Sequence, residues 1–298
     1  MAEHKIPVDL YNPGQMFACM GFLEAADVLL GDAFGGFDWS DKAHAIFTLR
    51  AAGQKNPIEE ILSFLARAEV EVVSPRNIQG PWPKNSRAVL EFPAPLRELL
   101  KSDKKGYTAS ALPILVTDRK RALPITNWLE GDGRVALKLF AGKQVGAQLA
   151  SNMLQGDSKK RGTVGVRHLF EKIQVSAFRD PFGEVGPVGG RFGYDARGAW
   201  DAMRLGMSLD TQEILVQLSP CVEILAAIGL EHARPIFPST YEIKYAAWQR
   251  ILPVSLARVA LAVPETFLAN DQCRFFRAHL GDDQQYKKCF PAQEEPRV

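Results

Sequence analysis

The sequence lacks three features that would narrow its class at once: a strong net charge, a long apolar run and a cysteine motif. Its 36 Lys and Arg residues nearly balance 34 Asp and Glu residues, so the net charge is only +2 and indicates no acidic partner. The apolar runs fall well short of the ~18 residues of a membrane-spanning helix. The opening residues, MAEHKIPVDL, have no apolar signal-peptide core. We therefore expect a cytoplasmic protein with no membrane partner.

Motifs for catalysis or metal binding are also scarce. The four cysteines, at positions 19, 221, 273 and 289, show no CxxC spacing. This argues against a zinc site and predicts reduced thiols, two of them in apolar core segments. The five histidines form no HxxxH or HExxH pair, and we find no GxxxxGK[ST] loop, GxGxxG turn or GxSxG elbow. We expect no catalytic residues, no metal and no cofactor.

The stretch around which the chain is organised is NPGQMFACMGFLEAADVLL, residues 12–30. Asn12 can cap a helix, Pro13 suits the first helical position, and Gln15 is placed to complete a capping box. Residues 16–23 are all apolar or Gly, which predicts a helix buried on most sides. Gly21 costs ~1 kcal/mol relative to Ala within a helix, so we expect another part of the protein to pack closely against it.

A second stretch, PCVEILAAIGLE at residues 220–231, repeats this pattern after Ser219. Further helices are expected at 57–68, 95–100, 143–154 and 196–205. Strands are expected at 6–10, 45–49, 69–73, 87–92, 114–116, 173–178, 241–248 and 256–263. Helices and strands mix without βαβ alternation, which favours an α+β fold with a largely antiparallel sheet. We expect one domain over residues 1–298, with a polar, frayed tail at 282–298.

Basic residues provide the main indication of binding. Three of them lie in the glycine-bounded loop at 156–165, one follows this loop, and two flank a glycine-rich segment at 183–193: Lys159, Lys160, Arg161, Arg167, Arg191 and Arg197. Flexible cations beside glycines suit contacts with a nucleic-acid backbone. The alternative is a solvated surface with no ligand.

Three stretches, NPGQMFACMGFLEAADVLLG, RFGYDARGAWDAMRLGMS and PCVEILAAIGLEHARP, resemble in this order a CRISPR-associated family of type I-G systems, formerly type I-U. Members of this family look like a reduced large subunit of the Cascade surveillance complex. The resemblance implies a non-catalytic subunit whose partners are crRNA, target DNA, other Cascade subunits and a nuclease-helicase recruited on target binding. In such assemblies, base pairing reads the target and protein reads a short flanking motif.

Three alternatives remain open from the sequence. The chain is short for a large subunit, so it could be a repeated Cascade backbone subunit that grips guide RNA. It could be a guide-RNA-processing endoribonuclease, for which His168 beside the basic loop is the best feature. It could also be a scaffold unrelated to nucleic acid.

Overall fold

The computed structural model describes residues 1–41, 45–76, 87–90, 114–126, 137–140, 144–157, 162–172, 176–199, 215–283 and 286–296. Within these ranges the chain forms a mixed α+β fold, as predicted, and its strand pairs are antiparallel except for β4 with β5. A continuous cluster of buried apolar side chains runs from Ile6 to Ala292. No helix in the described ranges is long and apolar enough to cross a membrane.

The first sheet has the strand order β1 (Ala2–Val8), β3 (Ala45–Ala51), β2 (Phe34–Asp38) and β12 (Leu252–Pro253). Its inner face carries Ile6, Val8, Phe47 and Leu49, all buried. Helix α1 (Pro13–Leu29) connects β1 to β2, and α2 (Pro57–Arg67) follows β3. This is the connectivity of the first five elements of the ferredoxin-like βαββαβ motif. The next strand, β4 (Glu69–Pro75), leaves the motif and joins another sheet.

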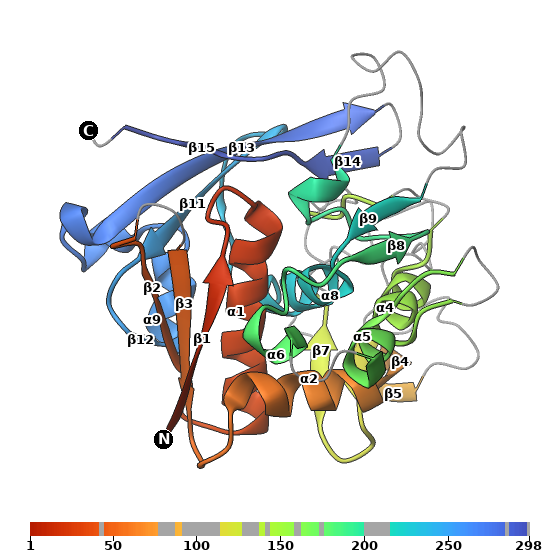
Figure 1. Ribbon diagram of the computed structural model, residues 1–298. Coiled ribbons are helices and arrows are strands. Elements are labelled where there is room, and N and C mark those ends of the chain that lie inside the picture. The colour runs from red at the N-terminus through yellow and green to blue at the C-terminus, as the bar shows by residue number, and fades with distance from the viewer. Residues whose placement is uncertain are drawn as a thin grey trace.

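The centre of the fold is the pair formed by α1 and α8 (Pro220–Gly229) (Figure 1). Asn12 and Ser219 cap these helices, and proline occupies the first turn of each. A Cβ atom added to Gly21 would lie 2.6 Å from the carbonyl carbon of Leu225 and closer still to its oxygen. A Cβ added to Gly229 would meet the carbonyl oxygen of Phe17 in the same way. Gly21 therefore lies against the carbonyl of Leu225, and Gly229 lies against the carbonyl of Phe17. This contact confirms the close neighbour expected at Gly21.

A second sheet, built from strands in the C-terminal part of the chain, runs across the top of Figure 1. It contains β10 (Ile236–Ser239), β11 (Glu242–Trp248), β13 (Cys273–Asp283), β14 (Tyr286–Cys289) and β15 (Gln293–Glu294). Tyr245 and Phe276 stack on its inner face, with ring centroids 5.4 Å apart. The Tyr245 hydroxyl donates to the carbonyl of Leu10 at 2.8 Å, which ties this sheet to the end of β1.

Most of the remaining elements lie to the right of α1 in Figure 1. A third sheet has the order β5 (Arg87–Leu90), β4, β6 (Ile114–Thr117) and β7 (Ala122–Ile125). The helices on this side are α2, α4 (Gly146–Gln155), α5 (Val166–Lys172) and α6 (Ser176–Arg179). Strands β8 (Gly186–Val188) and β9 (Val216–Leu218) form a small ribbon, and β9 leads into α8. The 3-10 helix η3 (Ala196–Gly198) lies between these two strands in the chain.

The structure differs from the sequence predictions at several places. The predicted strand at 256–263 is wrong, because 254–260 forms α9 (Val254–Ala260), which buries Val254, Ala257 and Ala260 at helical spacing. The predicted strand at 173–178 overlaps α6 instead. Of the predicted helix at 196–205 the structure describes residues 196–199, and 196–198 form η3. In the tail expected to fray, β14 and β15 both pair with β13. The predicted helix at 95–100 lies outside the described residues.

Candidate functional site

A buried carboxylate, that of Asp195, joins the starts of the two central helices. It accepts a hydrogen bond from Nδ2 of Asn12 at 2.9 Å and one from the backbone N–H of Ser219 at 3.1 Å. Helix N-termini carry partial positive charge and unsatisfied N–H groups. A negative group held between two of them is therefore stabilised without contact with solvent.

The loop that carries Asp195 is fixed to α1 at a second point. Oδ1 of Asn12 accepts hydrogen bonds from the backbone N–H groups of Gly14 and Ala196, both at 3.1 Å. Gln15 does not complete the predicted capping box, since its Oε1 accepts from the backbone N–H of Asp9 instead. The starts of α1 and α8 and the loop that carries Asp195 thus meet at one place, which we call the Asp195 junction: residues 12–15, 193–197, 219 and 223.

Glu223 supplies a second buried carboxylate to the Asp195 junction. Its two oxygens accept hydrogen bonds from the backbone N–H groups of Gly193 and Asp195, each at 2.8 Å. Burial, together with the nearby charge of Asp195, raises the pKa of Glu223 to about 7, and the two backbone hydrogen bonds keep it from rising higher. The side chain consequently changes charge near neutral pH inside the protein.

The Asp195 junction presents one cation to the surface. The guanidinium of Arg197 donates to Asp195 through Nε at 2.9 Å and through Nη2 at 2.7 Å. The Asp195 side chain is fully buried, whereas that of Arg197 is 32% exposed. A bidentate pair of this kind fixes the guanidinium plane, so Arg197 has a defined orientation at the edge of a pocket.

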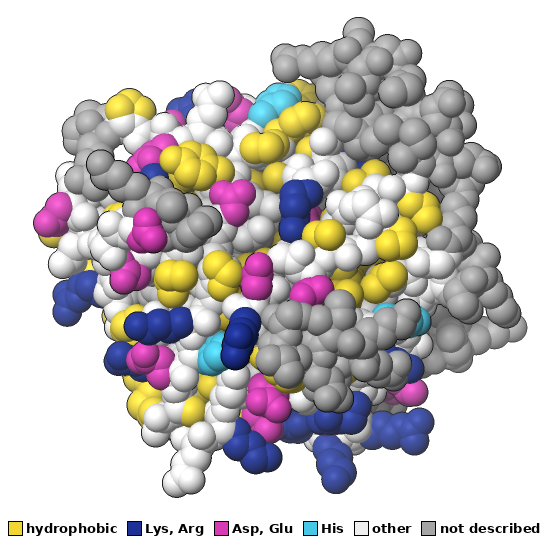
Figure 2. Space-filling model, in the orientation of Figure 1, with side chains coloured by type: hydrophobic (Ala, Val, Ile, Leu, Met, Phe, Trp, Pro, Cys, Tyr) yellow, Lys and Arg dark blue, Asp and Glu magenta, His cyan; other side chains and the backbone are white. Residues whose placement is uncertain are grey.

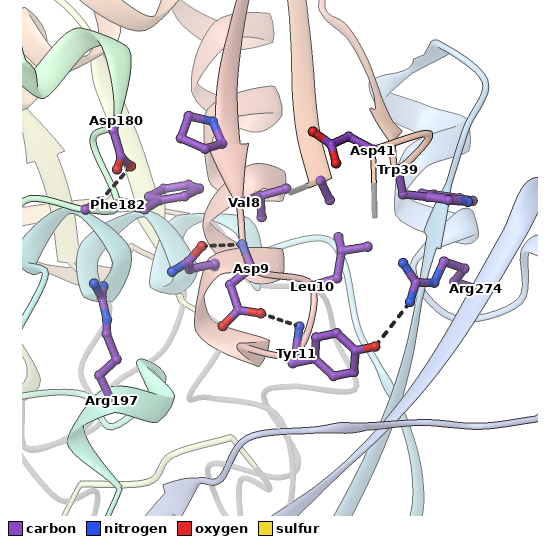
Figure 3. A pocket seen from close by; sticks show the side chains of 14 residues that line it. Val8, Asp9, Leu10, Tyr11, Trp39, Asp41, Asp180, Phe182, Arg197 and Arg274 are labelled. Carbon is purple, nitrogen blue, oxygen red and sulfur yellow. Dashed lines mark hydrogen bonds between the residues drawn. The ribbon is translucent and has the colours of Figure 1, made fainter. Parts of the chain in front are cut away.

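This pocket, which we call the β1-end pocket, lies where β1 turns into α1 (Figure 3). Its volume is about 560 Å³, within the ~300–1,000 Å³ usual for small-ligand sites. The residues that line it come from five segments of the chain: Pro7, Val8, Asp9, Leu10, Tyr11, Gln15, Trp39, Asp41, Ala45, Asp180, Phe182, Gly183, Arg197 and Arg274. Sequence reasoning missed it, because its residues are spread from Pro7 to Arg274 and no local pattern relates them.

One wall of the β1-end pocket is aromatic and held by Arg274. The guanidinium carbon of Arg274 lies 5.9 Å from the ring centroid of Trp39 and 6.0 Å from that of Tyr11. Its Nε donates to Glu294 at 2.7 Å, and its Nη2 donates to the hydroxyl of Tyr11 at 3.2 Å. Cation–π contacts and the ion pair together keep this wall in place.

Of the basic residues predicted from the sequence, the three that the structure describes are Arg167, Arg191 and Arg197, and they make hydrogen bonds to different parts of the chain. Lys159, Lys160 and Arg161 lie outside the described residues. Arg191 donates from Nη2 to the carbonyl of Gly198 at 3.1 Å, which places it beside Arg197 in the same loop. Arg167 lies at another place, where its Nε donates to the carbonyl of Ala66 at 2.9 Å.

Arg167 instead joins a group of cations at the C-terminal end of α2, which we call the α2 cluster: Arg67, Arg119, Lys120, Arg121 and Arg167. Arg119 lies 3.7 Å from Glu69, and Arg121 lies 5.5 Å from the ring centroid of Phe64. Lys and Arg side chains gather at this lower edge in Figure 2, near α2 and the β6–β7 turn. The turn sequence DRKR is visible in the chain, but its proximity to α2 is not.

No group of three His, Cys, Asp or Glu side chains in the described ranges is placed to hold a metal ion. Nδ1 of His168 is buried and has no hydrogen-bond partner within the described ranges. No described side chain therefore orients this ring through Nδ1, as a catalytic histidine would require. All four cysteines are buried, and none forms a disulfide. In comparisons with known proteins, no family model, no curated protein and no solved structure matches this chain.

Proposed function

We propose that this protein is a non-catalytic subunit of a type I CRISPR RNA-guided Cascade complex, in which it contributes to the binding of crRNA and target DNA in antiviral defence. Support comes first from the sequence resemblance of residues 12–31, 191–208 and 220–235 to the type I-G family. As in that family, its partners would be other Cascade subunits and a nuclease-helicase recruited in the cytoplasm. Flanking-motif recognition would belong to the same role.

The single structural observation that carries the proposal is the α2 cluster. Arg67, Arg119 and Lys120 are exposed, and they lie at the C-terminal end of a helix whose dipole favours cations. Arg119 faces an exposed carboxylate, Glu69, at 3.7 Å, and an exposed pair of this kind contributes little stability. These side chains can therefore turn to phosphate groups at little cost to the fold.

Salt-dependent binding of the assembled complex tests this function. The complex is reconstituted with guide RNA and the products of neighbouring genes, and target-DNA affinity is measured at several salt concentrations. The first variant replaces Arg67, Arg119 and Lys120 with Ala. The second replaces the loop cations Lys159, Lys160 and Arg161. A control variant replaces three exposed cations outside both groups: Lys5, Lys55 and Arg250.

Each phosphate contact contributes ~0.9 to the slope of log affinity against log salt for duplex DNA. The first variant should therefore lower the slope by up to roughly 2.7, and the control should leave it unchanged. If the variant and the parent show equal affinities and slopes, the α2 cluster is a solvated surface. If the protein does not enter a complex that contains RNA, the proposed function is wrong.

A Cascade backbone subunit is the second candidate, and the connectivity β1–α1–β2–β3–α2 favours it. RNA-recognition modules of this topology stack bases on aromatic residues of the sheet. Here the outer face of β1 and β3 carries Glu3, Lys5 and Arg50, with Arg50 paired to Glu3 at 2.6 Å, so these two strands lack stacking residues and only Phe34 of β2 lies opposite Arg50 on this face of the described sheet. Native mass spectrometry separates the candidates, since a backbone subunit is present in several copies per guide RNA. Incubation with precursor RNA, with and without chelator, tests for an endoribonuclease.

A further inference from the structure

The β1-end pocket combines hydrogen-bond acceptors, a donor and an aromatic wall in one cavity. Two carboxylates are fixed in it by backbone groups: Oδ1 of Asp9 accepts from the N–H of Tyr11 at 2.9 Å, and Oδ1 of Asp180 accepts from the N–H of Gly183 at 2.8 Å (Figure 3). Among the described residues, the second oxygen of each carboxylate makes no hydrogen bond. Because the backbone sets the orientation of each side chain, both are preorganised acceptors on the lining of the pocket.

Gln15 adds a donor from the floor of the pocket. Its side chain is 93% buried, and its Oε1 accepts from the N–H of Asp9 at 2.7 Å. Its Nε2 makes no hydrogen bond with any described residue. This N–H₂ group is an unused donor on the lining of the pocket, so an acceptor atom on a ligand can accept a hydrogen bond from it.

The charges of the pocket exclude some ligands. Arg197 and Arg274 are each compensated by a carboxylate outside the cavity, namely Asp195 and Glu294. Asp9 and Asp180 take part in no ion pair within the described part of the chain. The cavity is therefore negative, which disfavours a bare phosphate inside it and favours a neutral group that presents N–H donors. A phosphate would have to remain at the rim, beside Arg197.

Unpaired nucleobases meet these requirements when they carry an amino group. Single-stranded RNA is recognised by stacking of splayed bases on aromatic side chains or on guanidinium planes, and by hydrogen bonds to their edges. An amino group on cytosine, adenine or guanine can donate to a carboxylate. Uracil has carbonyl oxygens at the corresponding positions, and these would be repelled by Asp9 and Asp180.

We propose that the β1-end pocket binds one unpaired, amino-bearing nucleobase, with the ring against Trp39 and Tyr11, the amino group at Asp9 and Asp180, and an acceptor atom at Gln15. This inference rests on the proposed function, since it names the part of a nucleic acid that this site would hold. The flanking phosphate lies at Arg197. The pocket therefore discriminates against uracil.

Titration of the purified protein with the 5′-monophosphates of cytidine, guanosine, adenosine and uridine tests this inference. Binding is followed by tryptophan fluorescence, with Trp39→Phe identifying the signal. We expect at least one amino-bearing nucleotide to bind about tenfold more tightly than the uridine nucleotide, and Asp180→Asn to remove this preference. Asp271→Asn, an exposed carboxylate outside the pocket, is the matched control and should retain it.

Other probes give the outcomes that overturn it. Equal binding of all four nucleotides, or of inorganic phosphate, would show that the carboxylates do not select a base. If agmatine binds and nucleotides do not, the pocket holds a cationic side chain of a partner protein. Thermal melting of each variant establishes that it is folded. Failure here leaves the salt dependence of the assembled complex as a separate test of the proposed function, because the α2 cluster and the pocket share no residue.

Discussion

Replacing Gly21 with Ala should destabilise the protein through a single added methyl group. The new Cβ would lie 2.6 Å from the carbonyl carbon of Leu225, whereas an ordinary contact is 3.4 Å or more. Because the carbonyl oxygen lies closer still, the helices must separate by at least about 0.8 Å, and gaps of ~0.5–1 Å already forfeit roughly a quarter to a half of each dispersion contact. Overpacking of a core costs ~1–3 kcal/mol, with the upper end expected where backbone is struck.

The higher helix propensity of Ala returns ~1 kcal/mol, which leaves a net loss of about 2 kcal/mol. For a chain of 298 residues, with ~2.1 cal/mol/K of unfolding entropy per residue, the melting temperature should fall by roughly 3 °C. Val28→Ala, at a 55% exposed site of the same helix, is the control and should change stability by less than ~0.5 kcal/mol. The double variant with Gly229→Ala should cost less than the sum of the single variants, because either methyl separates the same helices. An unchanged melting temperature, or strict additivity, would refute the reciprocal contact.

Three further predictions concern buried ionisable groups. The pKa of Glu223 rises from 4.5 to about 7 on folding, so the folded state binds more protons between these values and the free energy of unfolding falls as pH rises. The Glu223→Gln variant lacks this pH dependence. In urea unfolding, the free energy of unfolding of the variant relative to that of the parent should rise by about 3 kcal/mol between pH 5 and pH 8. If this difference is the same at both pH values, the prediction is wrong. Arg258→Met leaves the carboxylate of Glu24, which is 4% exposed, without its partner at 2.6 Å, and should cost roughly 3 kcal/mol of stability. Adding Glu24→Gln to this variant should restore part of the loss. An unchanged urea midpoint for Arg258→Met would show that the ion pair does not stabilise the fold. Burial raises the pKa of Cys19, and that of Cys221 to about 12, so a thiol reagent should modify the native protein only at its unfolding rate; rapid labelling would show an accessible thiol.

Local rules predicted the central helices well, because their signals lie within a few residues. The cap-proline starts at Asn12 and Ser219 and the uninterrupted apolar runs are sufficient to place α1 and α8. Gly21 even indicated a close neighbour. The sequence could not identify Leu225 as that neighbour, since nothing local relates two positions about 200 residues apart.

The site was less predictable for the same reason. Arg197 was selected for its charge, but the side chain that fixes it, Asp195, reads in the sequence only as one carboxylate in a glycine-rich loop. Trp39 and Asp180 share the β1-end pocket although they lie in different segments, and only the packing of β1 brings them together. The predicted strand at 256–263 failed because its small apolar residues fit a period of two as readily as a helical one, and only burial against α1 decides between them.

The reciprocal glycine contact also bears on how the chain matures during synthesis. Helix α1 is made first, but the surface it must cover arrives only with residue 229. At ~5–20 residues per second, the ribosome needs about 10–40 s to supply it. For that interval the face of α1 that packs on α8 has no permanent partner, although β3 and α2 already contact the helix elsewhere, and closing so long a loop is entropically costly and slow. The N-terminal segment is thus the part of the nascent chain most in need of a chaperone or an early-binding subunit, and truncation before residue 220 should yield aggregate rather than a smaller folded protein.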